Sequence, residues 1–343
     1  MKQFNITGIC IPERHYMVDT SQKLDEVMKL VEAGAYFTIN RPRQYGKTTT
    51  MYLLDQRLKG TEYLALQMSF EGIGDVVFEK ESVFARKFVE MLAREFKFIR
   101  EEKHSEVLLE KLAGVNEFDD VSLLITQLFS TIGKKVVLMI DEVDKSSNNQ
   151  LFVSFLAMLR DKYLRQNAGR DHTFHAIILA GVHDVKTLKL KLRPDEERKY
   201  NSPWNIAADF KVDMSFNPAE ISTMLKDYAN ETGVKIDIPT MSKKLHEYTA
   251  GYPFLVSKLC KTIDEDILPK KQEKAWDTGD LEQAVALLLN ERNTNFDSLF
   301  NNLEHHPELY ELTKEIILGQ KEVGYAPDNR FIMLGESFCI FRE

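Results

Sequence analysis

A glycine, a lysine and a threonine at residues 46–48 stand in a setting suited to binding phosphate. The apolar run at 35–40 predicts a strand before them, and residues 49–58 predict a helix after them. In such a turn, backbone N–H groups and the helix N-terminus face phosphate oxygens, and the lysine amine reaches the same atoms. The segment therefore predicts a phosphate-binding P-loop for a nucleoside triphosphate. Its residues are Arg41, Pro42, Arg43, Gln44, Tyr45, Gly46, Lys47, Thr48 and Thr49.

The loop departs from the usual pattern G-x-x-x-x-G-K-[ST] at its first position, which is Arg41 instead of glycine. A side chain there makes a positive φ costly, so the entry to the loop must differ from the commonest form, and Pro42 could stiffen it. Arg41 and Arg43 could contact phosphate or cap the loop. On this segment alone, a surface turn that merely opens a helix is the alternative.

A second motif consists of five apolar residues, 136–140, that end in Asp141 and Glu142. An uninterrupted apolar run predicts a strand buried on both faces of a parallel sheet. The two carboxylates would then emerge at the strand end where open α/β sheets bind ligands. We expect Thr48 and Asp141 to hold Mg²⁺, and Glu142 to orient or deprotonate the attacking water while Lys47 contacts phosphate. An acidic loop after a core strand is the alternative.

At these residues the chain resembles the bacterial AAA-like ATPases, relatives of the STAND class of signalling P-loop NTPases. The similarity covers roughly residues 1–265 and extends to the opening at 16–19, the strand-like 176–181, the segment 201–206 and the segment 250–254. The usual loop of this family is Arg-Pro-Arg-x-aromatic-Gly-Lys, so the resemblance accounts for Arg41. It implies ATP and Mg²⁺ as cofactors and hydrolysis coupled to a conformational switch or to partner signalling.

The resemblance also implies two further site residues. The opening lies near the nucleotide base in relatives, so Tyr16 could stack on adenine, and a core tyrosine is the alternative. Pro253 belongs to the Gly-x-Pro step of a helical lid, which in relatives lies near the bound nucleotide. Many relatives continue into a nuclease-like domain; no acid-x-Lys nuclease core appears before Glu343, so we expect no such domain in these residues.

The elements that position these residues alternate between strand and helix, which predicts an α/β fold with a parallel, doubly wound sheet over 1–212. Strands are expected at 4–10, 35–40, 63–70, 136–140 and 174–180, and helices at 21–33, 49–58, in pieces over 75–132, and at 151–164. His183 and Asp184 follow the last strand and could sense the γ-phosphate or form a plain turn.

Strand signals disappear from Asn217 on and helices follow one another, which predicts an α-helical lid over 213–343 with 212–216 as a crossing strand. Helices are expected at 218–230, 241–249, 253–267, 279–290 and 307–318. Residues 330–342 alternate loosely and suggest a hairpin. Helices followed by a hairpin are compatible with a winged-helix end, an expectation that rests mainly on the resemblance.

The charge and the cysteine content of the chain argue against several classes of function. The net charge of −8 argues against attraction of the whole surface to DNA or acidic membranes. A basic cluster between Lys186 and Lys199 is interrupted by acids, which favours a solvated surface over nucleic-acid contact. Three scattered cysteines predict neither disulfides nor a zinc site. No signal peptide or membrane segment is evident, so we expect a cytoplasmic protein.

Two functions from different classes remain. The first is an ATPase whose hydrolysis resets a switch, and the second is a nucleotide-binding scaffold with negligible hydrolysis. Both Lys47 and Glu142 favour the first, and an ATPase linked to DNA ranks lower. The chain lacks the Asn-Lys-x-Asp tetrapeptide of guanine readers, which favours ATP. Candidates for an arginine finger, which a neighbouring subunit of a homo-oligomer could also supply, are Arg160, Arg165, Arg170, Arg193 and Arg198.

Overall fold

The structure, a computed structural model, describes residues 1–146, 150–182, 203–291, 300–301, 303–319, 329–337 and 340. The chain forms two compact units. The sheet unit comprises Leu24–Asn40 and Thr50–Val212, and the helical unit comprises Met1–Lys23, Arg41–Thr49 and Asp213–Glu343. The division into a P-loop ATPase domain at 1–212 and a helical lid at 213–343 stays a prediction. The first 23 residues and the P-loop belong to the helical unit.

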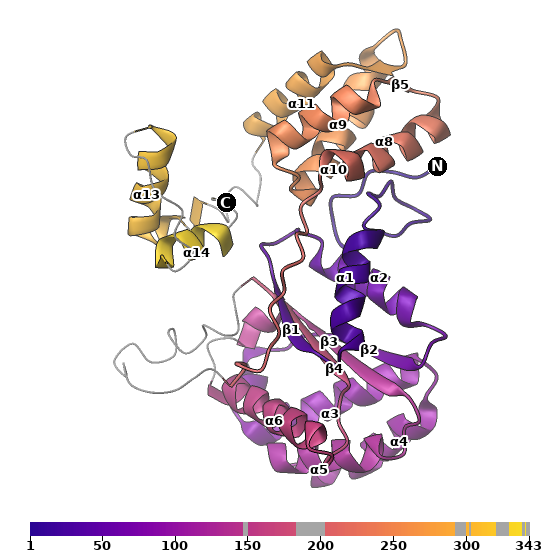
Figure 1. The fold of residues 1–343 in the computed structure, drawn as a ribbon, viewed down its shortest axis with the longest axis vertical. Coiled ribbons are helices and arrows are strands. Elements are labelled where there is room, and N and C mark those ends of the chain that lie inside the picture. Colours follow the sequence, from indigo (N-terminus) through magenta and orange to yellow (C-terminus); the bar gives the residue numbers. More distant parts are fainter. Residues whose placement is uncertain are drawn as a thin grey trace. The chain divides into compact units, whose positions relative to one another are not determined.

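The sheet unit contains four parallel strands in the order β1-β4-β3-β2 (Figure 1). They are β1 (Tyr36–Asn40), β2 (Tyr63–Ser69), β3 (Lys135–Asp141) and β4 (Ala176–Gly181). Asn40 lies opposite Gly181, and Ser69 lies opposite Asp141. The carboxyl ends of the strands therefore align at one edge of the sheet. This is the predicted doubly wound α/β fold of a P-loop NTPase.

Helices cover both faces of this sheet. Figure 1 shows α1 and α2 on one side and α3, α5 and α6 on the other. The helices are α1 (Ser21–Glu32), α2 (Lys47–Leu58), α3 (Glu81–Phe98), α4 (Glu102–Lys111), α5 (Phe118–Phe129) and α6 (Gln150–Asn167), with 3₁₀ turns at Asp75–Phe78, Leu112–Gly114 and Val143–Ser146. Gly34, at φ +67°, ends the first helical segment as predicted.

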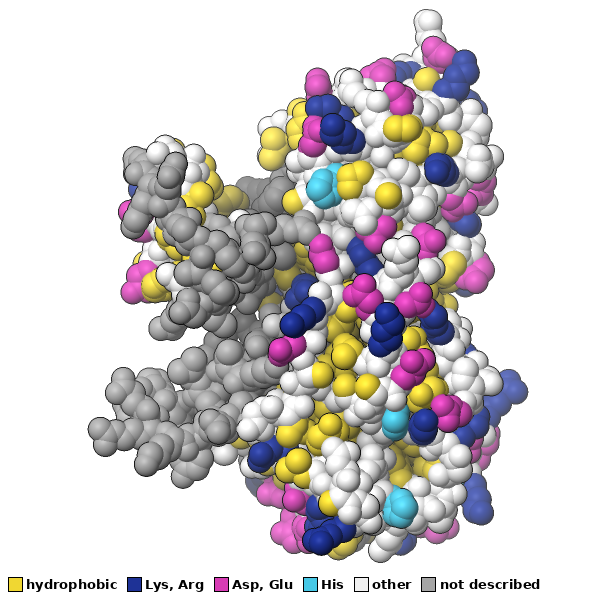
Figure 2. All heavy atoms as spheres, viewed as in Figure 1, with side chains coloured by type: hydrophobic (Ala, Val, Ile, Leu, Met, Phe, Trp, Pro, Cys, Tyr) yellow, Lys and Arg dark blue, Asp and Glu magenta, His cyan; other side chains and the backbone are white. Residues whose placement is uncertain are grey.

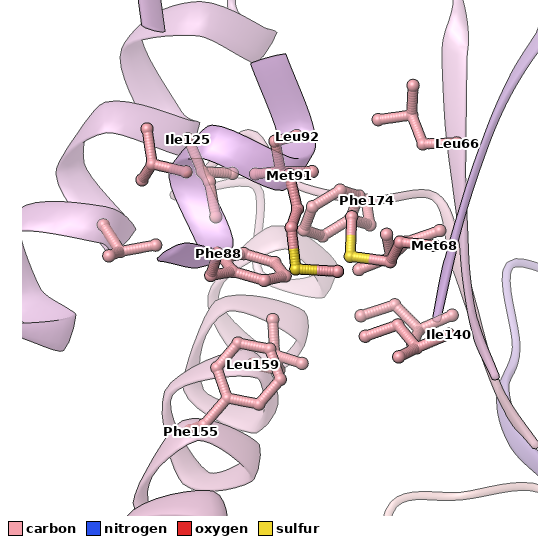
Figure 3. Close-up of a cluster of buried hydrophobic side chains, with 14 of the residues drawn as sticks. Leu66, Met68, Phe88, Met91, Leu92, Ile125, Ile140, Phe155, Leu159 and Phe174 are labelled. Carbon is pink, nitrogen blue, oxygen red and sulfur yellow. The ribbon is translucent and has the colours of Figure 1, made fainter. Parts of the chain in front are cut away.

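The main hydrophobic core lies between the sheet and α3, α5 and α6 (Figure 3). Alternate strand residues such as Leu138 and Ile140 point into it, as expected for a period of two. Phe88 and Phe155 meet edge to face with their ring centroids 4.8 Å apart. Val137 and Met139 point to the opposite face and are fully buried too. β3 is thus buried on both faces, as its uninterrupted apolar run predicts.

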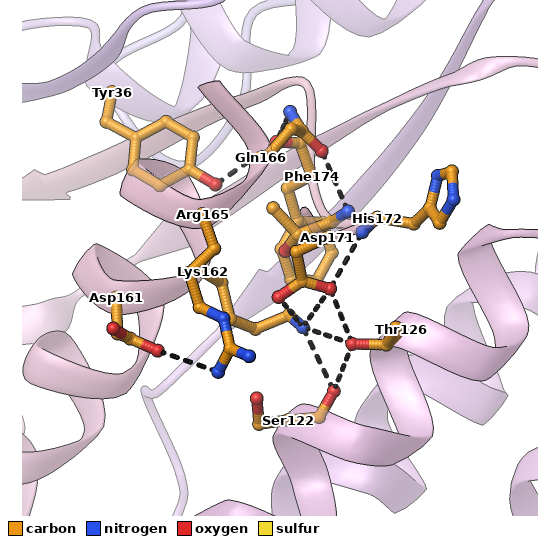
Figure 4. A network of polar contacts seen from close by, with 11 residues as sticks. Tyr36, Ser122, Thr126, Asp161, Lys162, Arg165, Gln166, Asp171, His172 and Phe174 are labelled. Carbon is orange, nitrogen blue, oxygen red and sulfur yellow. Dashed lines mark hydrogen bonds and ion pairs between the residues drawn. The ribbon is translucent and has the colours of Figure 1, made fainter. Parts of the chain in front are cut away.

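A buried ion pair sits beside this core (Figure 4). Lys162 Nζ lies 2.9 Å from Asp171 Oδ2, and the two side chains are 0% and 5% exposed. The lysine also donates to Thr126 Oγ1 and to the Ser122 carbonyl oxygen, and the carboxylate accepts from Thr126 Oγ1 and the His172 N–H. Burial lowers the pKa of Lys162. Burial raises the pKa of Asp171, but its hydrogen bonds outweigh this and hold that pKa below its ordinary value.

The helical unit is built mainly from α8 (Pro218–Thr232), α9 (Ile238–Thr249), α10 (Pro253–Thr262) and α11 (Thr278–Asn290). A π-helical turn, Ile263–Ile267, and a 3₁₀ turn, Leu268–Lys270, follow α10. Its core includes an aromatic group made by Phe4, Tyr16, Tyr228 and Trp276. The predicted start of α8 is confirmed, because Asn217 Oδ1 accepts from the Glu220 N–H at 2.9 Å and proline occupies the first turn.

Two predicted strands are wrong. Residues 4–10 form no strand, because Gly8 turns at φ +64° and the Asn5 amide donates back to the Ile9 carbonyl oxygen. The only bridge in this stretch of the described chain joins Gln3 to His15. Residues 212–216 form no strand either. The backbone that pairs with β1 on its free edge is Ala208, in an isolated bridge to Phe37.

Two further differences concern the C-terminal part. Strands do not cease at Asn217, because the two-residue strands β5 (Lys235–Ile236) and β6 (Ala275–Trp276) pair in parallel. The hairpin is wrong over the described residues 330–337, which form helix α14 (Arg330–Ser337) after α13 (Pro307–Ile317). Phe331 and Leu334, one helical turn apart, pack together against Leu303 and Leu309. The winged-helix end stays a prediction.

Charged side chains of both signs intersperse over the described part of the face in Figure 2, in keeping with the acidic but mixed composition. Among the described residues, no helix combines the length and apolar character needed to span a bilayer. His183, Asp184, the basic cluster at 186–199, Asn201, Ser202 and Cys339 lie outside the described residues.

Candidate functional site

The P-loop connects the end of β1 to the first turn of α2. The backbone enters the left-handed region at two loop positions, Gln44 with φ 57° and Gly46 with φ 82°. Arg41 is not among the positive-φ residues of the described chain. An arginine therefore fits at the first loop position without strain, because the loop makes its tight turns further along. The entry differs from the commonest form, as the sequence predicts.

Lys47 is the central cation of the loop. Its side chain is buried, and Nζ donates to the Arg41 carbonyl oxygen at 2.8 Å and to the Pro42 carbonyl oxygen at 2.9 Å. These bonds fold the ammonium back over its own loop. Phosphate oxygens are stronger acceptors than neutral carbonyls, so a phosphate placed in the loop would compete for this group.

The N-terminal segment adjoins the loop through Thr49, whose Oγ1 accepts from the Cys10 N–H at 3.1 Å. Burial raises the pKa of the Cys10 thiol, so the cysteine stays neutral here. His15 steadies the same segment by accepting from the Ile11 N–H through Nδ1 at 2.8 Å. No pattern in the sequence predicts the contact between Cys10 and Thr49, because these residues are about forty positions apart.

Tyr45 ties the loop to residues far along the chain. Its hydroxyl lies 2.9 Å from Ser215 Oγ, and its ring stacks on Tyr252 with centroids 5.0 Å apart and planes at 24°. The Tyr252 hydroxyl donates to the Arg43 carbonyl oxygen at 2.6 Å. We call Tyr45, Ser215 and Tyr252 the loop clamp. Sequence reasoning missed these contacts and the roles of Ser215 and Tyr252, although Tyr252 is the middle residue of the Gly-x-Pro step that ends in Pro253.

The two distant clamp residues flank a close backbone contact between Gly251 and Phe216. The Phe216 N–H donates to the Gly251 carbonyl oxygen at 2.8 Å. A Cβ on Gly251 would lie 2.1 Å from the Phe216 oxygen, and φ there is +74°. Only glycine fits this position. Ser215 is held in addition by Asp213, whose Oδ1 accepts from both its N–H and its hydroxyl.

The acidic strand end has a strained backbone. Asp141 is the last residue of β3, is 5% exposed, and accepts from the Glu142 N–H through Oδ1 at 2.9 Å. Glu142 adopts the left-handed region at φ 54°, which costs a non-glycine residue about 1 kcal/mol. Asp144 accepts from the Val182 N–H, which joins the ends of β3 and β4. Strain of this kind concentrates at functional positions.

The oxygen donors at hand suit a magnesium ion carried by a nucleotide. Mg²⁺ is commonly bound by one or two protein oxygens together with substrate phosphates and water. The Thr48 hydroxyl and the Asp141 carboxylate are donors of this type. Within the described ranges, no group of three or more His, Cys, Asp or Glu side chains could hold a metal by itself.

Comparison with known families shows to which family the chain belongs. The family model described as "AAA-like domain" matches residues 13–333. The chain belongs to this AAA-like family. No curated protein matches it by sequence.

The AAA-like fold recurs in solved structures of low sequence identity. The Walker-type ATPase of Pyrococcus abyssi is 13% identical with a TM-score of 0.65, covering 98% of this chain and 93% of that chain. The Aeropyrum pernix ORC2 protein is 14% identical with a TM-score of 0.48, covering 97% and 81%. The Thermotoga maritima RuvB Holliday junction branch migration motor is 14% identical with a TM-score of 0.45, covering 84% and 78%. The similarity to the Pyrococcus abyssi ATPase supports the fold.

Two residues that the resemblance placed near nucleotide occupy structural positions in this AAA-like chain. Tyr16 is 2% exposed and packs in the helical core, with ring centroids 5.0 Å from Phe4 and 5.2 Å from Tyr228. The structure therefore favours the core alternative over stacking on adenine. Pro253 is buried in the first turn of α10, directly after the clamp residue Tyr252.

The arginine candidates show no finger among the described residues. Arg165 lies 3.6 Å from Asp161 on the same helix, and both side chains are exposed. Arg160 belongs to α6 as well, and Arg170 follows it on the surface. Arg193 and Arg198 lie outside the described residues. The assignment of a finger stays a prediction.

Proposed function

We propose that this AAA-like protein binds ATP with Mg²⁺ at the P-loop and hydrolyses it, and that hydrolysis drives a STAND-type switch that signals to a protein partner. The topology of the sheet carries the proposal. β1 and β3 are parallel strands of one sheet, separated only by β4. The P-loop follows the carboxyl end of β1, and Asp141 ends β3 at the same edge of the sheet. Ligands of open α/β sheets bind at that edge.

Each residue has a role that follows from its chemistry. Loop N–H groups and the first turn of α2 would bind the phosphates, and Lys47 would exchange its two carbonyl acceptors for phosphate oxygens. Thr48 and Asp141 would hold Mg²⁺, which supplies charge neutralisation when bound. Glu142 would orient the attacking water or accept its proton. The left-handed backbone of Glu142 supports this role, because strained non-glycine residues of this kind concentrate at functional positions.

The base would be adenine. The sequence has no Asn-Lys-x-Asp reader for guanine. The helical unit would undergo the conformational response to the nucleotide. Residues 41–49 of the loop belong to this unit, and the clamp joins the loop directly to Ser215 and Tyr252. A homo-oligomer that supplies an arginine finger, and a cytoplasmic site of action, belong to the same proposal.

The test is ATP binding and hydrolysis with Mg²⁺ over a range of protein concentrations. Lys47→Ala should abolish tight binding, and Glu142→Gln should keep binding while turnover falls about 100-fold or more. Lys29→Ala and Glu110→Gln, both at exposed helix positions, are the matched controls and should change neither. A rate per subunit that rises with concentration would indicate a site completed by a neighbouring subunit.

The outcomes separate this proposal from its competitors. Tight binding without turnover, unchanged by Glu142→Gln, would mean a nucleotide-binding scaffold. Turnover that requires added DNA would indicate the DNA-linked variant. Absence of binding by the unmodified protein would refute the proposed function.

A further inference from the structure

We propose that Tyr252, Tyr45 and Ser215 are positioning residues that hold the P-loop in its phosphate-binding conformation and thereby set nucleotide affinity from within the helical unit. This inference rests on the proposed nucleotide binding. Ser215 and Tyr252 lie outside the P-loop segment, so the clamp adds two residues that the motif does not contain.

The clamp holds the loop on both sides of its strained residue. The Tyr252 hydroxyl bonds the carbonyl oxygen of Arg43, and the Tyr45 ring and hydroxyl are held by Tyr252 and Ser215. Gln44, between them, has φ 57° and is exposed. A non-glycine residue keeps such a backbone only when its surroundings fix it. The hydrogen bonds and the ring stack provide that restraint.

The far side of the clamp is rigid. Ser215 and Tyr252 are the immediate neighbours of the Phe216–Gly251 contact, which leaves no room for a Cβ. Lys23 Nζ donates to the Ser215 carbonyl oxygen at 2.5 Å and to Glu220 at 2.8 Å, which fixes the same turn. Tyr252 is also the N-cap residue of α10. The loop is thus anchored to the start of a core helix, so the position of one depends on the other.

The bonds of Lys47 link this anchor to phosphate. Its ammonium holds the carbonyl oxygens of Arg41 and Pro42, directly before the carbonyl that Tyr252 holds. When phosphate draws Lys47 away, these two carbonyls lose their donor and the Tyr252 bond remains as a restraint on this side of the loop. Weakening the clamp should therefore reduce nucleotide affinity more than the chemical step.

The first arm of the test measures affinity and turnover. Tyr252→Phe removes the donated hydrogen bond and keeps the ring stack, and it should weaken ATP binding about 2- to 12-fold. Tyr252→Leu removes both and should weaken it further. Tyr45→Phe and Ser215→Ala should each weaken binding in the same range. The double variant should be no weaker than Ser215→Ala alone, because the two residues share one hydrogen bond and Ser215→Ala removes it together with the bond to Asp213. Turnover at saturating ATP should stay within about 2-fold.

Tyr248→Phe is the matched control, since this tyrosine is 47% exposed on α9 of the same unit. It should leave affinity unchanged. The thermal midpoint without nucleotide is recorded for every variant. An affinity loss in Tyr252→Phe that merely follows a lowered midpoint would overturn the positioning role, as would unchanged affinity.

The second arm needs no nucleotide. Trypsin cleaves after arginine, and the bond after Arg43 contains the carbonyl that Tyr252 holds. Cleavage there should be several-fold faster in Tyr252→Leu, while cleavage after the exposed Lys59 should be unchanged in the same samples. Equal rates after Arg43 would show that the clamp does not hold the loop. If the unmodified protein binds no nucleotide, the proposed function fails, and this arm still decides whether the clamp restrains the loop.

Discussion

Gly251 should be the position of the helical unit that is least tolerant of a methyl group. In Gly251→Ala the new Cβ would lie 2.1 Å from the Phe216 oxygen, 2.8 Å from its nitrogen and 2.9 Å from its carbonyl carbon. All three are backbone atoms, so a rotamer change cannot relieve the clash. The backbone would have to move by more than about 1 Å to restore ordinary contact, at about 1–3 kcal/mol. The left-handed φ of +74° adds about 1–2 kcal/mol for alanine. We expect a loss of about 2–5 kcal/mol in unfolding free energy.

The neighbouring residue is a built-in control. Ala250 is also left-handed, with φ 47°, at the end of α9. Ala250→Gly removes that strain at the cost of more unfolded-state entropy, so it should be neutral or stabilise by up to about 1 kcal/mol. Adding a methyl group at Gly251 and removing one at the adjacent Ala250 should therefore change the unfolding free energy in opposite directions.

The chain has two tryptophans, one in each unit, which makes the assay local. Trp276 is 4% exposed in the helical core, with its ring centroid 4.7 Å from that of Tyr228. In a Trp204→Phe background, its fluorescence during urea unfolding reports the helical unit alone. Equal midpoints for Gly251→Ala and its parent would refute the steric reasoning. So would a cost for Ala250→Gly as large as that for Gly251→Ala.

Three further predictions concern the buried pair and the metal. Lys162→Met should lower the unfolding free energy by about 3–5 kcal/mol, because it leaves Asp171 charged and buried. Asp171→Leu added to the same chain should recover part of this loss. Denaturant unfolding that shows no recovery would contradict the pairing argument. The native pKa of Asp171 lies below its ordinary value of 3.8, so its stabilisation is present above that value and is lost as pH falls through the lower native pKa. Thermal midpoints between about pH 6 and pH 2 should therefore fall less steeply in Asp171→Asn than in the parent. Chelation of Mg²⁺ should abolish ATP turnover, and Thr48→Ala should raise the Mg²⁺ concentration needed for half-maximal turnover; an unchanged Mg²⁺ dependence would exclude Thr48 as a ligand.

Local patterns in the sequence determined most of the sheet unit. Uninterrupted apolar runs identify buried parallel strands such as β3, since a strand covered on both faces needs no alternation. Asn217 and Pro218 locate the start of α8 because capping depends on neighbouring residues only. The phosphate-binding loop and the acids after β3 are readable for the same reason: each lies within one short segment, and the family match over residues 13–333 agrees with the class they predict.

Tertiary structure decided what depends on distant residues. Tyr16 and Tyr252 are both tyrosines beside motifs, yet one is enclosed by Phe4 and Tyr228 and the other holds the loop. Their sequence neighbourhoods do not distinguish these roles, because Tyr228 and Arg43, the partners of Tyr16 and Tyr252, lie about two hundred residues away from them. Residues 330–337 look loosely alternating but form α14, since packing against Leu309 favours a helical repeat. The P-loop turns at Gln44, which has a left-handed backbone that its own residue type disfavours, so the local sequence does not identify this turning point.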